Sequence, residues 1–247
     1  MIMTQSISVK NFKLRYSEID YDTVLKPSAL LQFLQDVASE NAEELGFGYS
    51  YIVRKNLAWF LLKYHIEFDD YPRGMSDLKI KTNPRGYNKL FAYRDFEIFS
   101  NDKLIGRASS TWALVDLEMG GMRDVADELG GNPHMIQFEK RDNDLKYEKV
   151  KPPEKIDKEH IFEIRFDDLD VNQHVNNVNY IVWAFEPLDF EFRKAKKLKT
   201  LDMVFKKEVK YGNKIISQVE ISGDCTNHIL KRDDEELCLI KAQWVNK

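Results

Sequence analysis

The most chemically suggestive part of the sequence is residues 170–177, which read Asp-Val-Asn-Gln-His-Val-Asn-Asn. Asp170, Asn172 and His174 alternate there, and alternate residues of an extended segment point to the same side. An imidazole can transfer protons or hold a water molecule near neutral pH. We therefore interpret Asp170, Asn172 and His174 as a candidate catalytic group.

The next residues, Val175, Asn176 and Asn177, precede an apolar run that predicts a helix over 178–185. Asparagine is a good N-cap, and a helix N-terminus presents free backbone N–H groups with a positive partial charge. Such groups suit an oxyanion that develops on a carbonyl. An alternative remains open, in which the whole run is a polar turn whose side chains only satisfy the backbone.

An internal repeat helps to separate these two readings. Residues 15–22 resemble residues 165–172, which lie 150 positions later, with the order basic, aromatic, polar, acidic, aliphatic, Asp, apolar, Asx. In the first copy Val24 stands where His174 stands in the second. This difference favours the second copy as the chemical one.

The two halves of the chain predict the same succession of elements around these copies. In the first half a helix is expected over 27–45, and strands over 58–68, 77–83, 90–99 and 105–115. In the second half the helix over 178–185 is followed by expected strands over 202–211, 214–222, 227–231 and 236–245. The halves are expected to be residues 1–118 and 159–247, joined by a Gly- and Pro-containing linker over 119–158.

Composition limits the function classes. A net charge of −4 argues against general affinity for nucleic acid. The two cysteines, Cys225 and Cys238, form no CxxC pair, so neither a disulfide framework nor a zinc site is indicated. No signal peptide is visible and the apolar runs are too short to span a bilayer, so we expect a cytoplasmic enzyme without membrane insertion.

Three segments resemble the acyl-acyl carrier protein (acyl-ACP) thioesterases, the plant plastid and bacterial family that terminates fatty acid synthesis. They are residues 168–181, which include Asn-Gln-His-Val-Asn-Asn, and residues 61–67 and 83–96. The resemblance covers nearly the whole chain. It implies an α+β tandem double hot-dog fold, in which each half is a curled antiparallel sheet around a central helix. The first half would shape the acyl pocket and the second would perform catalysis.

The resemblance also implies the catalytic residues Asp170, Asn172 and His174, together with Glu208. The family has a Glu-Cys pair that matches Glu208 and Val209 here. Valine offers no nucleophile, so we expect a base-activated water instead of an acyl-cysteine. Whether Glu208 or His174 takes the proton is left open, and Glu208 could also be a plain exposed carboxylate on the strand expected over 202–211.

The implied reaction is hydrolysis of fatty acyl-ACP to free fatty acid and carrier protein. Acyl carrier protein is acidic, so a basic docking site is expected, and Lys194, Lys196 and Lys197 lie in the densest basic run; the alternative is a solvated face. No metal or organic cofactor is implied. The other hypotheses are an acyl-CoA thioesterase of the same fold and a non-catalytic acyl-binding regulator. The protein could be a monomer or a homodimer.

Overall fold

A computed structural model describes residues 6–247 of the chain. The chain divides into two compact units. The first holds the chain up to Tyr64 together with Asp69–Lys146, and the second holds His65–Phe68 together with Tyr147–Lys247. No helix within residues 6–247 is both long enough and apolar enough to cross a bilayer.

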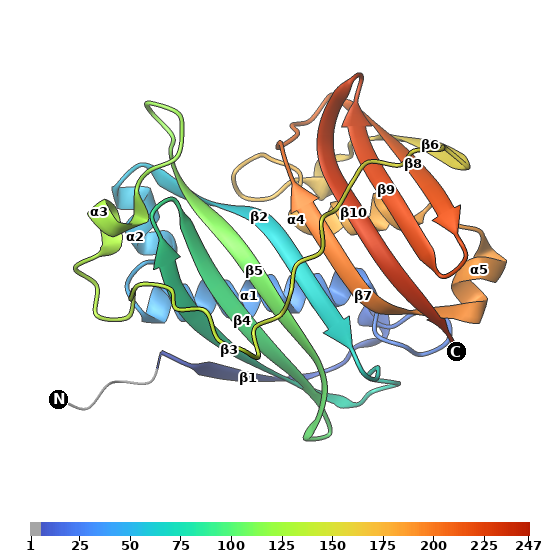
Figure 1. The fold of residues 1–247 in the computed structure, drawn as a ribbon, viewed down its shortest axis with the longest axis horizontal. Coiled ribbons are helices and arrows are strands. Elements are labelled where there is room, and N and C mark those ends of the chain that lie inside the picture. The colour runs from blue at the N-terminus through green and yellow to red at the C-terminus, as the bar shows by residue number, and fades with distance from the viewer. Residues whose placement is uncertain (1–5) are drawn as a thin grey trace. The chain divides into compact units, whose positions relative to one another are not determined.

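The first unit is a curled sheet around one long helix (Figure 1). Its strand order is β1-β3-β4-β5-β2, and β1, β3, β4 and β5 pair antiparallel. The strands are β1 (Ser8–Lys13), β2 (Leu57–Phe68), β3 (Asp77–Asn88), β4 (Phe91–Ser100) and β5 (Lys103–Asp116). The helical elements are η1 (Tyr16–Glu18), α1 (Pro27–Glu44), α2 (Tyr49–Arg54) and α3 (Val125–Leu129).

The central helix α1 confirms the helix expected from the sequence. Proline occupies the first helical turn, where its missing N–H costs nothing, and Gly46 follows the helix end with a φ of 81°. Its apolar residues recur at helical spacing, and Leu30 and Leu34 are almost fully buried. Burying one such side chain stabilises the fold by about 1.5–3 kcal/mol, so this face anchors the sheet.

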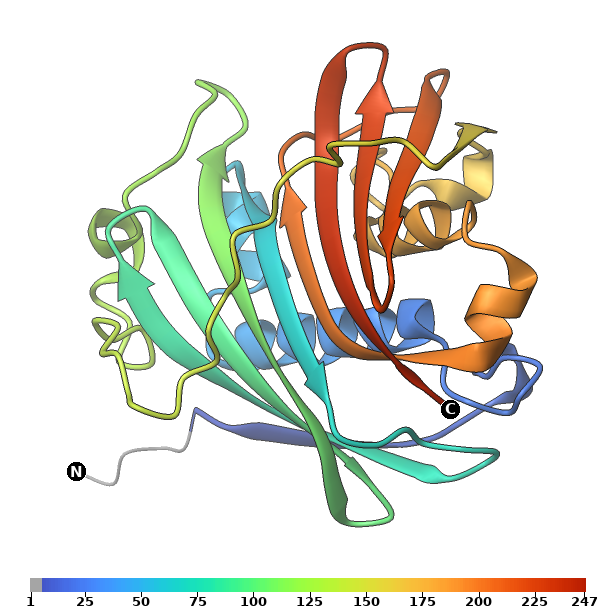
Figure 2. The ribbon, with the colours of Figure 1, turned by 45° about the vertical axis from the view of Figure 1, so that its right-hand side comes forward.

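The second unit repeats the design with a shorter helix. Its strand order is β7-β10-β9-β8-β6, with antiparallel pairing throughout. The strands are β6 (Lys158–Glu163), β7 (Lys196–Phe205), β8 (Lys214–Ser222), β9 (Cys225–Arg232) and β10 (Glu235–Asn246). The helical elements are η2 (Phe166–Asp168), α4 (Asn177–Phe185) and α5 (Phe190–Ala195). Each unit is a hot-dog fold, and Figure 2 shows the curl of each sheet.

Strand β7 lies earlier in the chain than the sequence predicted. We expected a strand over 202–211, whereas β7 spans Lys196–Phe205. Lys197 and Lys199 flank buried Leu198, and the long stem of a lysine allows it to occupy a strand position in what looks like a solvated run. Lys199 even donates through Nζ to the carbonyl of Phe68 at 2.7 Å. Residues 206–209 are consequently a connection after the strand.

Much of the expected linker over 119–158 belongs to the first unit. Asp124 caps α3 by accepting from the N–H of Ala126 at 2.8 Å, and Val125 and Leu129 are buried. Gly86 has a φ of 98°, and a Cβ there would lie 2.1 Å from the carbonyl oxygen of Ile136. The segment therefore packs closely against β3, and the first unit continues to Lys146.

Candidate active site

The segment before α4 is a tight turn, so the expected extended alternation of Asp170, Asn172 and His174 is wrong. Gln173 has a φ of 63°, and its N–H donates to the carbonyl of Asp170 at 3.0 Å. Asp170 Oδ1 accepts from the N–H of Asn172 at 2.8 Å and from that of His174 at 3.1 Å. The Asp170 carboxylate therefore holds the turn together.

The first unit contains the same turn. Asp20 Oδ1 accepts from the backbone N–H groups of Asp22 and Val24, both at 2.9 Å. Thr23 has a φ of 61°, and its N–H donates to the Asp20 carbonyl at 3.0 Å. The repeat seen in the sequence is therefore a repeat of local geometry, and the role of Asp170 in shaping the turn is common to both units.

Backbone pairing brings Glu208 to His174. The N–H of Val175 donates to the carbonyl of Val209 at 2.8 Å, and His174 forms an antiparallel bridge with Lys210. This pairing holds the connection after β7 beside the turn. His174 Nδ1 consequently lies 3.1 Å from Glu208 Oε2, although the sequence separates the two residues widely.

Equivalent pairing in the first unit identifies the counterparts of these two residues. The N–H of Leu25 donates to the carbonyl of Pro72 at 3.1 Å, and Val24 forms an antiparallel bridge with Arg73. Val24 therefore corresponds to His174, and Tyr71 corresponds to Glu208. Val24 and Tyr71 are both buried. The first unit keeps the frame and fills it with packing side chains, so the acid–base pair belongs to the second unit.

The environment shifts the pKa of both groups, upward for Glu208 and downward for His174. Partial burial and the charge of Asp170 raise the pKa of Glu208 to about 7, against an opposing effect of Lys210. Burial also lowers the pKa of His174, helped by Lys210 and opposed by Asp170. The Glu208 side chain keeps 39% of its surface exposed, so water reaches it. A carboxylate with a pKa near 7 is well matched to general base catalysis.

Asn172 is less firmly placed at this centre. It is exposed, and its side-chain amide has no hydrogen-bond partner within the described part of the chain. Its counterpart in the first unit is Asp22, a residue of the same turn. The structure joins His174 with Glu208 and leaves the Asn172 side chain facing solvent.

Fewer backbone N–H groups than expected are free to bind an oxyanion before α4. The N–H of Val175 is used by Val209, and the N–H of Asn176 donates to the carbonyl of Asp168 at 2.9 Å. These two N–H groups are unavailable to a substrate, which corrects the expectation for them. Asn176 does cap α4, because its Oδ1 accepts from the N–H of Val178 at 3.1 Å. The N–H of Asn177 finds no acceptor among residues 6–247, and it remains the candidate oxyanion donor.

Neither thiol has the character of a nucleophile. Cys238 is fully buried and Cys225 is partly buried, and burial raises the pKa of each thiol. Both are therefore held as unreactive thiols at neutral pH. Val209, next to Glu208, is fully buried.

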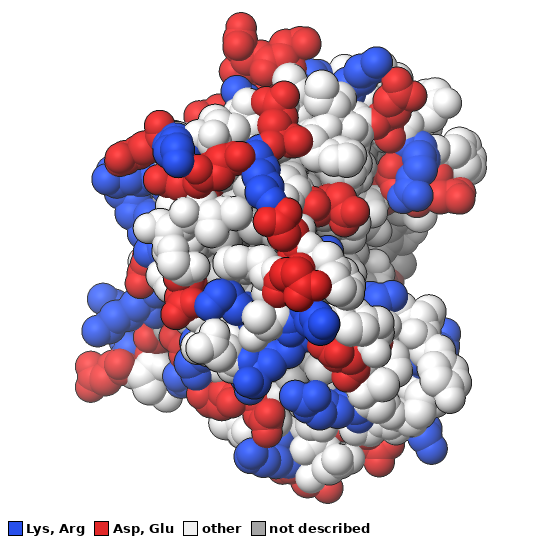
Figure 3. All heavy atoms as spheres, turned by 90° about the vertical axis from the view of Figure 1, so that its right-hand side faces the viewer, with Lys and Arg blue, Asp and Glu red and all other residues white. Residues whose placement is uncertain are grey.

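The basic run is less available for docking than the sequence suggested. Lys196 forms an ion pair with Asp224, and its Nζ lies 3.1 Å from Asn246 Oδ1, so the expectation for Lys196 needs correction. Lys194 is exposed at the end of α5, with its Nζ 6.0 Å from the centre of the Phe190 ring. Lys197 is half-buried on β7. On the face shown in Figure 3, basic and acidic side chains intermingle.

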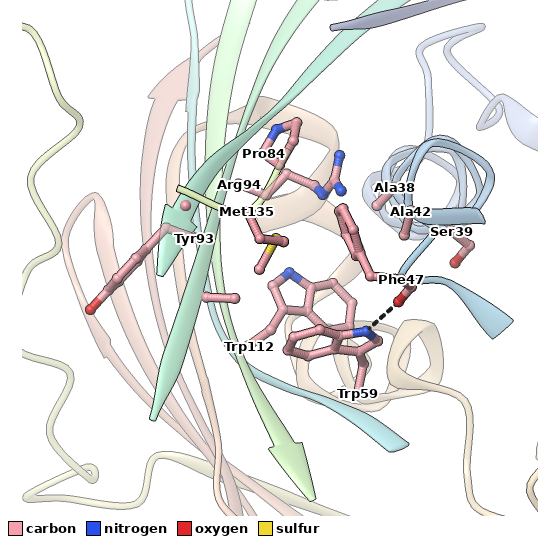
Figure 4. Close-up of a pocket in the computed structure, with 12 residues that line it drawn as sticks. Ala38, Ser39, Ala42, Phe47, Trp59, Pro84, Tyr93, Arg94, Trp112 and Met135 are labelled. Atoms are coloured by element: carbon pink, nitrogen blue, oxygen red, sulfur yellow. Dashed lines mark hydrogen bonds between the residues drawn. The ribbon is translucent and has the colours of Figure 1, made fainter. Parts of the chain in front are cut away.

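A pocket lies within the first unit, between α1 and the sheet. It has a volume of about 500 Å³ with its open mouth included. Most of its lining is apolar, and the principal side chains are Ala38, Ala42, Phe47, Trp59, Trp112 and Met135. Figure 4 shows both indole rings among the lining residues, with Trp59 Nε1 donating to the carbonyl of Phe47 at 2.9 Å. A chamber of this composition suits a hydrocarbon chain. Among the described lining residues Arg94 is the one cation, and sequence reasoning did not single it out.

Two family models match the chain. The model described as "Acyl-ACP thioesterase N-terminal domain" matches residues 6–131, and that described as "Acyl-ACP thioesterase C-terminal domain" matches residues 151–246. Together these matches cover most of the sequence, with one model for each unit. The two-part organisation inferred from the internal repeat is therefore that of a described family.

Curated relatives and solved structures agree with this match. The chain is 27% identical over 225 residues to an oleoyl-acyl carrier protein thioesterase of Coriandrum sativum, covering 84% of this chain and 61% of the relative. It is 23% identical to a palmitoyl-acyl carrier protein thioesterase of Arabidopsis thaliana, covering 96% and 64%. The chain thus spans about three fifths of the length of these relatives.

The solved structures show the same fold. A 12:0-ACP thioesterase from Umbellularia californica superposes with a TM-score of 0.87 at 20% identity, covering 99% of both chains. An acyl-ACP thioesterase from Bacteroides thetaiotaomicron superposes with a TM-score of 0.85 at 21% identity, covering 97% of this chain and 98% of the other. These similarities confirm the double hot-dog architecture.

Proposed function

We propose that this chain, which belongs to the acyl-ACP thioesterase family, hydrolyses the thioester of fatty acyl-ACP to free fatty acid and carrier protein. The observation that supports this most strongly is the His174–Glu208 pair. Its two atoms lie 3.1 Å apart, Glu208 has a pKa of about 7, and the duplicated frame of the first unit lacks both groups.

In the proposed reaction Glu208, as a carboxylate, accepts a proton from a water molecule. The water oxygen forms a bond to the thioester carbon, and the carbonyl oxygen becomes an oxyanion. The carbonyl then reforms as the carbon–sulfur bond breaks, and the proton held by Glu208 passes to the leaving sulfur. The products are a carboxylic acid and a thiol, Glu208 is ionised again, and no cysteine takes part.

The neighbouring groups support these steps. A neutral His174 directs its Nδ1 toward Glu208 Oε2 and orients that carboxylate. Asp170 fixes the turn that holds His174 and raises the pKa of Glu208. The N–H of Asn177, at the start of α4, donates to the oxyanion with the favourable dipole of the helix behind it. Asn172, which faces solvent, holds the incoming water or thioester.

The acyl chain is assigned to the pocket of the first unit. Its wall of small and aromatic residues excludes water from a hydrocarbon chain, and that burial is favourable by about 0.8 kcal/mol for each methylene. This assignment keeps the division of labour expected from the sequence, with the first unit binding the chain and the second performing the chemistry.

Two substitutions test the chemistry. Glu208→Gln and His174→Ala should each lower kcat on an acyl-ACP by about 100-fold or more, because each removes part of the acid–base machinery. Tyr71→Phe, at the counterpart of Glu208, is the matched control and should leave kcat near the wild-type value. Near-normal turnover by Glu208→Gln, with an unchanged circular dichroism spectrum, would refute the proposed base.

The carrier is tested separately. Acyl-ACP and acyl-CoA of equal chain length should be compared by kcat/KM, and we expect the carrier protein substrate to be preferred. Lys194→Glu combined with Lys197→Glu should raise KM for acyl-ACP more than for acyl-CoA if this basic run contacts the acidic carrier. Equal changes on both substrates would remove docking from these lysines. Preference for acyl-CoA in the wild type would favour the second hypothesis, an acyl-CoA thioesterase.

A further inference from the structure

The pocket of the first unit contains one feature that a plain hydrocarbon chain does not explain. Arg94, on β4, lines the pocket with only 5% of its surface exposed. In Figure 4 its guanidinium extends from the strand toward Ala38 on α1. A cation therefore lies in a chamber whose other walls are mainly apolar. Burying a charge is costly unless the charge is paired and hydrogen-bonded.

The protein satisfies only part of this guanidinium. Arg94 Nη1 donates to Asn41 Oδ1 at 2.6 Å and to Thr82 Oγ1 at 3.0 Å, and both acceptors are neutral. Nε and Nη2 find no acceptor within residues 6–247. The adjacent carboxylate of Asp95 is engaged by Arg85 instead. A guanidinium presents five N–H donors, so three of them remain for another molecule.

The second unit deals with a buried basic side chain differently. His228 lies on β9, which holds the same place in its sheet as β4 does in the first. Burial lowers the pKa of His228 to about 3, so the ring is neutral at pH 7 and donates or accepts with Thr226 Oγ1 at 2.8 Å. Burial also lowers the pKa of Arg94, to about 10, with a small opposing effect of Tyr64. Arg94 therefore stays charged, and the cost of burying it persists.

We propose that Arg94 is a specificity-determining residue that donates through Nε and Nη2 to an oxygen atom on the hydrocarbon part of the acyl chain. A guanidinium can only donate hydrogen bonds, so the ligand must supply an acceptor such as a hydroxyl or keto oxygen. The preferred substrates are then oxygenated acyl chains. This inference rests on the proposed function, because it assigns the pocket to the acyl chain.

Selectivity for an oxygen atom on the acyl chain is expected to be larger than selectivity for the length of the chain. A pocket distinguishes one methylene by about 10- to 200-fold, whereas a site built to hydrogen-bond an oxygen rejects the analogue that lacks it much more strongly. An unsubstituted chain would cover Nε and Nη2 and leave a desolvated charge without an acceptor. The competing explanation is that water molecules accept the hydrogen bonds of Arg94 Nε and Nη2. This explanation predicts no preference for oxygenated chains.

Binding measurements on the whole protein test the proposal. The probes are the methyl esters of an unsubstituted fatty acid and of its positional hydroxy isomers at equal chain length; the ester prevents the head group from acting as the anion. We expect at least one isomer to bind tenfold or more tightly than the unsubstituted ester. Arg94→Met, which keeps the length of the side chain, should abolish that preference. Equal or tighter binding of the unsubstituted ester by the wild type would overturn the proposal.

A second variant protects the test against misfolding of Arg94→Met. Asn41→Asp places a carboxylate beside Nη1, so it should weaken the preference for the hydroxy isomer while raising the melting temperature. An unchanged preference in Asn41→Asp, or in a folded Arg94→Met, would also contradict the proposal. Hydrolysis of unsubstituted acyl-ACP by the wild type is measured alongside. Selective binding without hydrolysis would refute the proposed function alone, and hydrolysis without selective binding would refute the Arg94 assignment alone.

Discussion

The ionisation of Glu208 sets a specific pH dependence. A general base works in its ionised form, so kcat/KM should rise with pH and level off above the pKa of about 7. With that value, about 9% of Glu208 is ionised at pH 6 and about 91% at pH 8, so the rate should increase roughly tenfold between them. An ordinary glutamate would already be ionised at pH 6 and would give an almost flat profile.

Asp170→Asn perturbs this profile without removing the turn. The asparagine Oδ1 can still accept from the N–H groups of Asn172 and His174, while the negative charge that raises the pKa of Glu208 is lost. The midpoint should therefore move to lower pH. The movement should be smaller than the effect of burial, which is the larger cause. A midpoint lower by one unit would raise the ionised fraction at pH 6 about fivefold.

The opposite charge provides the control. Lys210 lowers the pKa of Glu208, so Lys210→Met should move the midpoint of the profile to higher pH. The assay is kcat/KM for one acyl-ACP from pH 5.5 to 9, with circular dichroism recorded at each end of the range. Identical midpoints in the wild type, Asp170→Asn and Lys210→Met would refute Glu208 as the titrating base, because its carboxyl interacts with both charges.

Three stability predictions accompany this one. Gly86→Ala should lower the melting temperature clearly, because the added Cβ would meet the carbonyl of Ile136 and the φ of 98° disfavours a side chain; an unchanged melting temperature would show that this segment relaxes at no cost. Glu208→Gln should raise the melting temperature at pH 8 and not at pH 4. The pKa of Glu208 is higher in the folded than in the unfolded protein, so ionisation of this carboxyl destabilises the fold, and the loss of stability grows as pH rises from the unfolded-state pKa to the folded-state pKa. His65→Gln removes the ring nitrogen that lies 2.6 Å from Oδ1 of buried Asp202, and at pH 6 it should cost about 3 kcal/mol. Because the pKa of His65 is raised, the stability that its protonated form contributes falls as pH rises, so urea unfolding should show a larger loss at pH 6 than at pH 9.

The sequence predicted the two central helices, α1 and α4, and most strands because their signals are local. Helical spacing and a proline start predicted α1, and runs rich in aromatic and β-branched residues predicted the strands of the first half. The repeat at residues 15–22 and 165–172 indicated the duplication. The start of β7 was missed because lysines on a strand resemble a solvated run, although Lys196, Lys197 and Lys199 are all partly buried.

In the candidate site, too, features with a local sequence signal were predicted, whereas features that depend on contacts between distant segments were not. His174 was found from its motif, and Glu208 only from family resemblance, because the contact between them depends on backbone pairing between distant segments. The occupied N–H groups of Val175 and Asn176 were beyond prediction for the same reason. Arg94 gave no signal, since a lone arginine in a strand does not reveal whether a carboxylate will face it in the folded protein.

Under the proposed mechanism, the duplicated turn sets the number of reaction centres in each chain. Both units build the same loop, but the first has buried Val24 and Tyr71 where the second has His174 and Glu208, so the proposed acid–base pair occurs once per polypeptide. A duplicated fold therefore coexists with a single proposed turnover site per chain. A tight-binding inhibitor of the thioester site would therefore titrate one equivalent per polypeptide. The equivalent turn of the first unit, which has Val24 and Tyr71 in place of His174 and Glu208, is the natural place in which to engineer a second reaction centre.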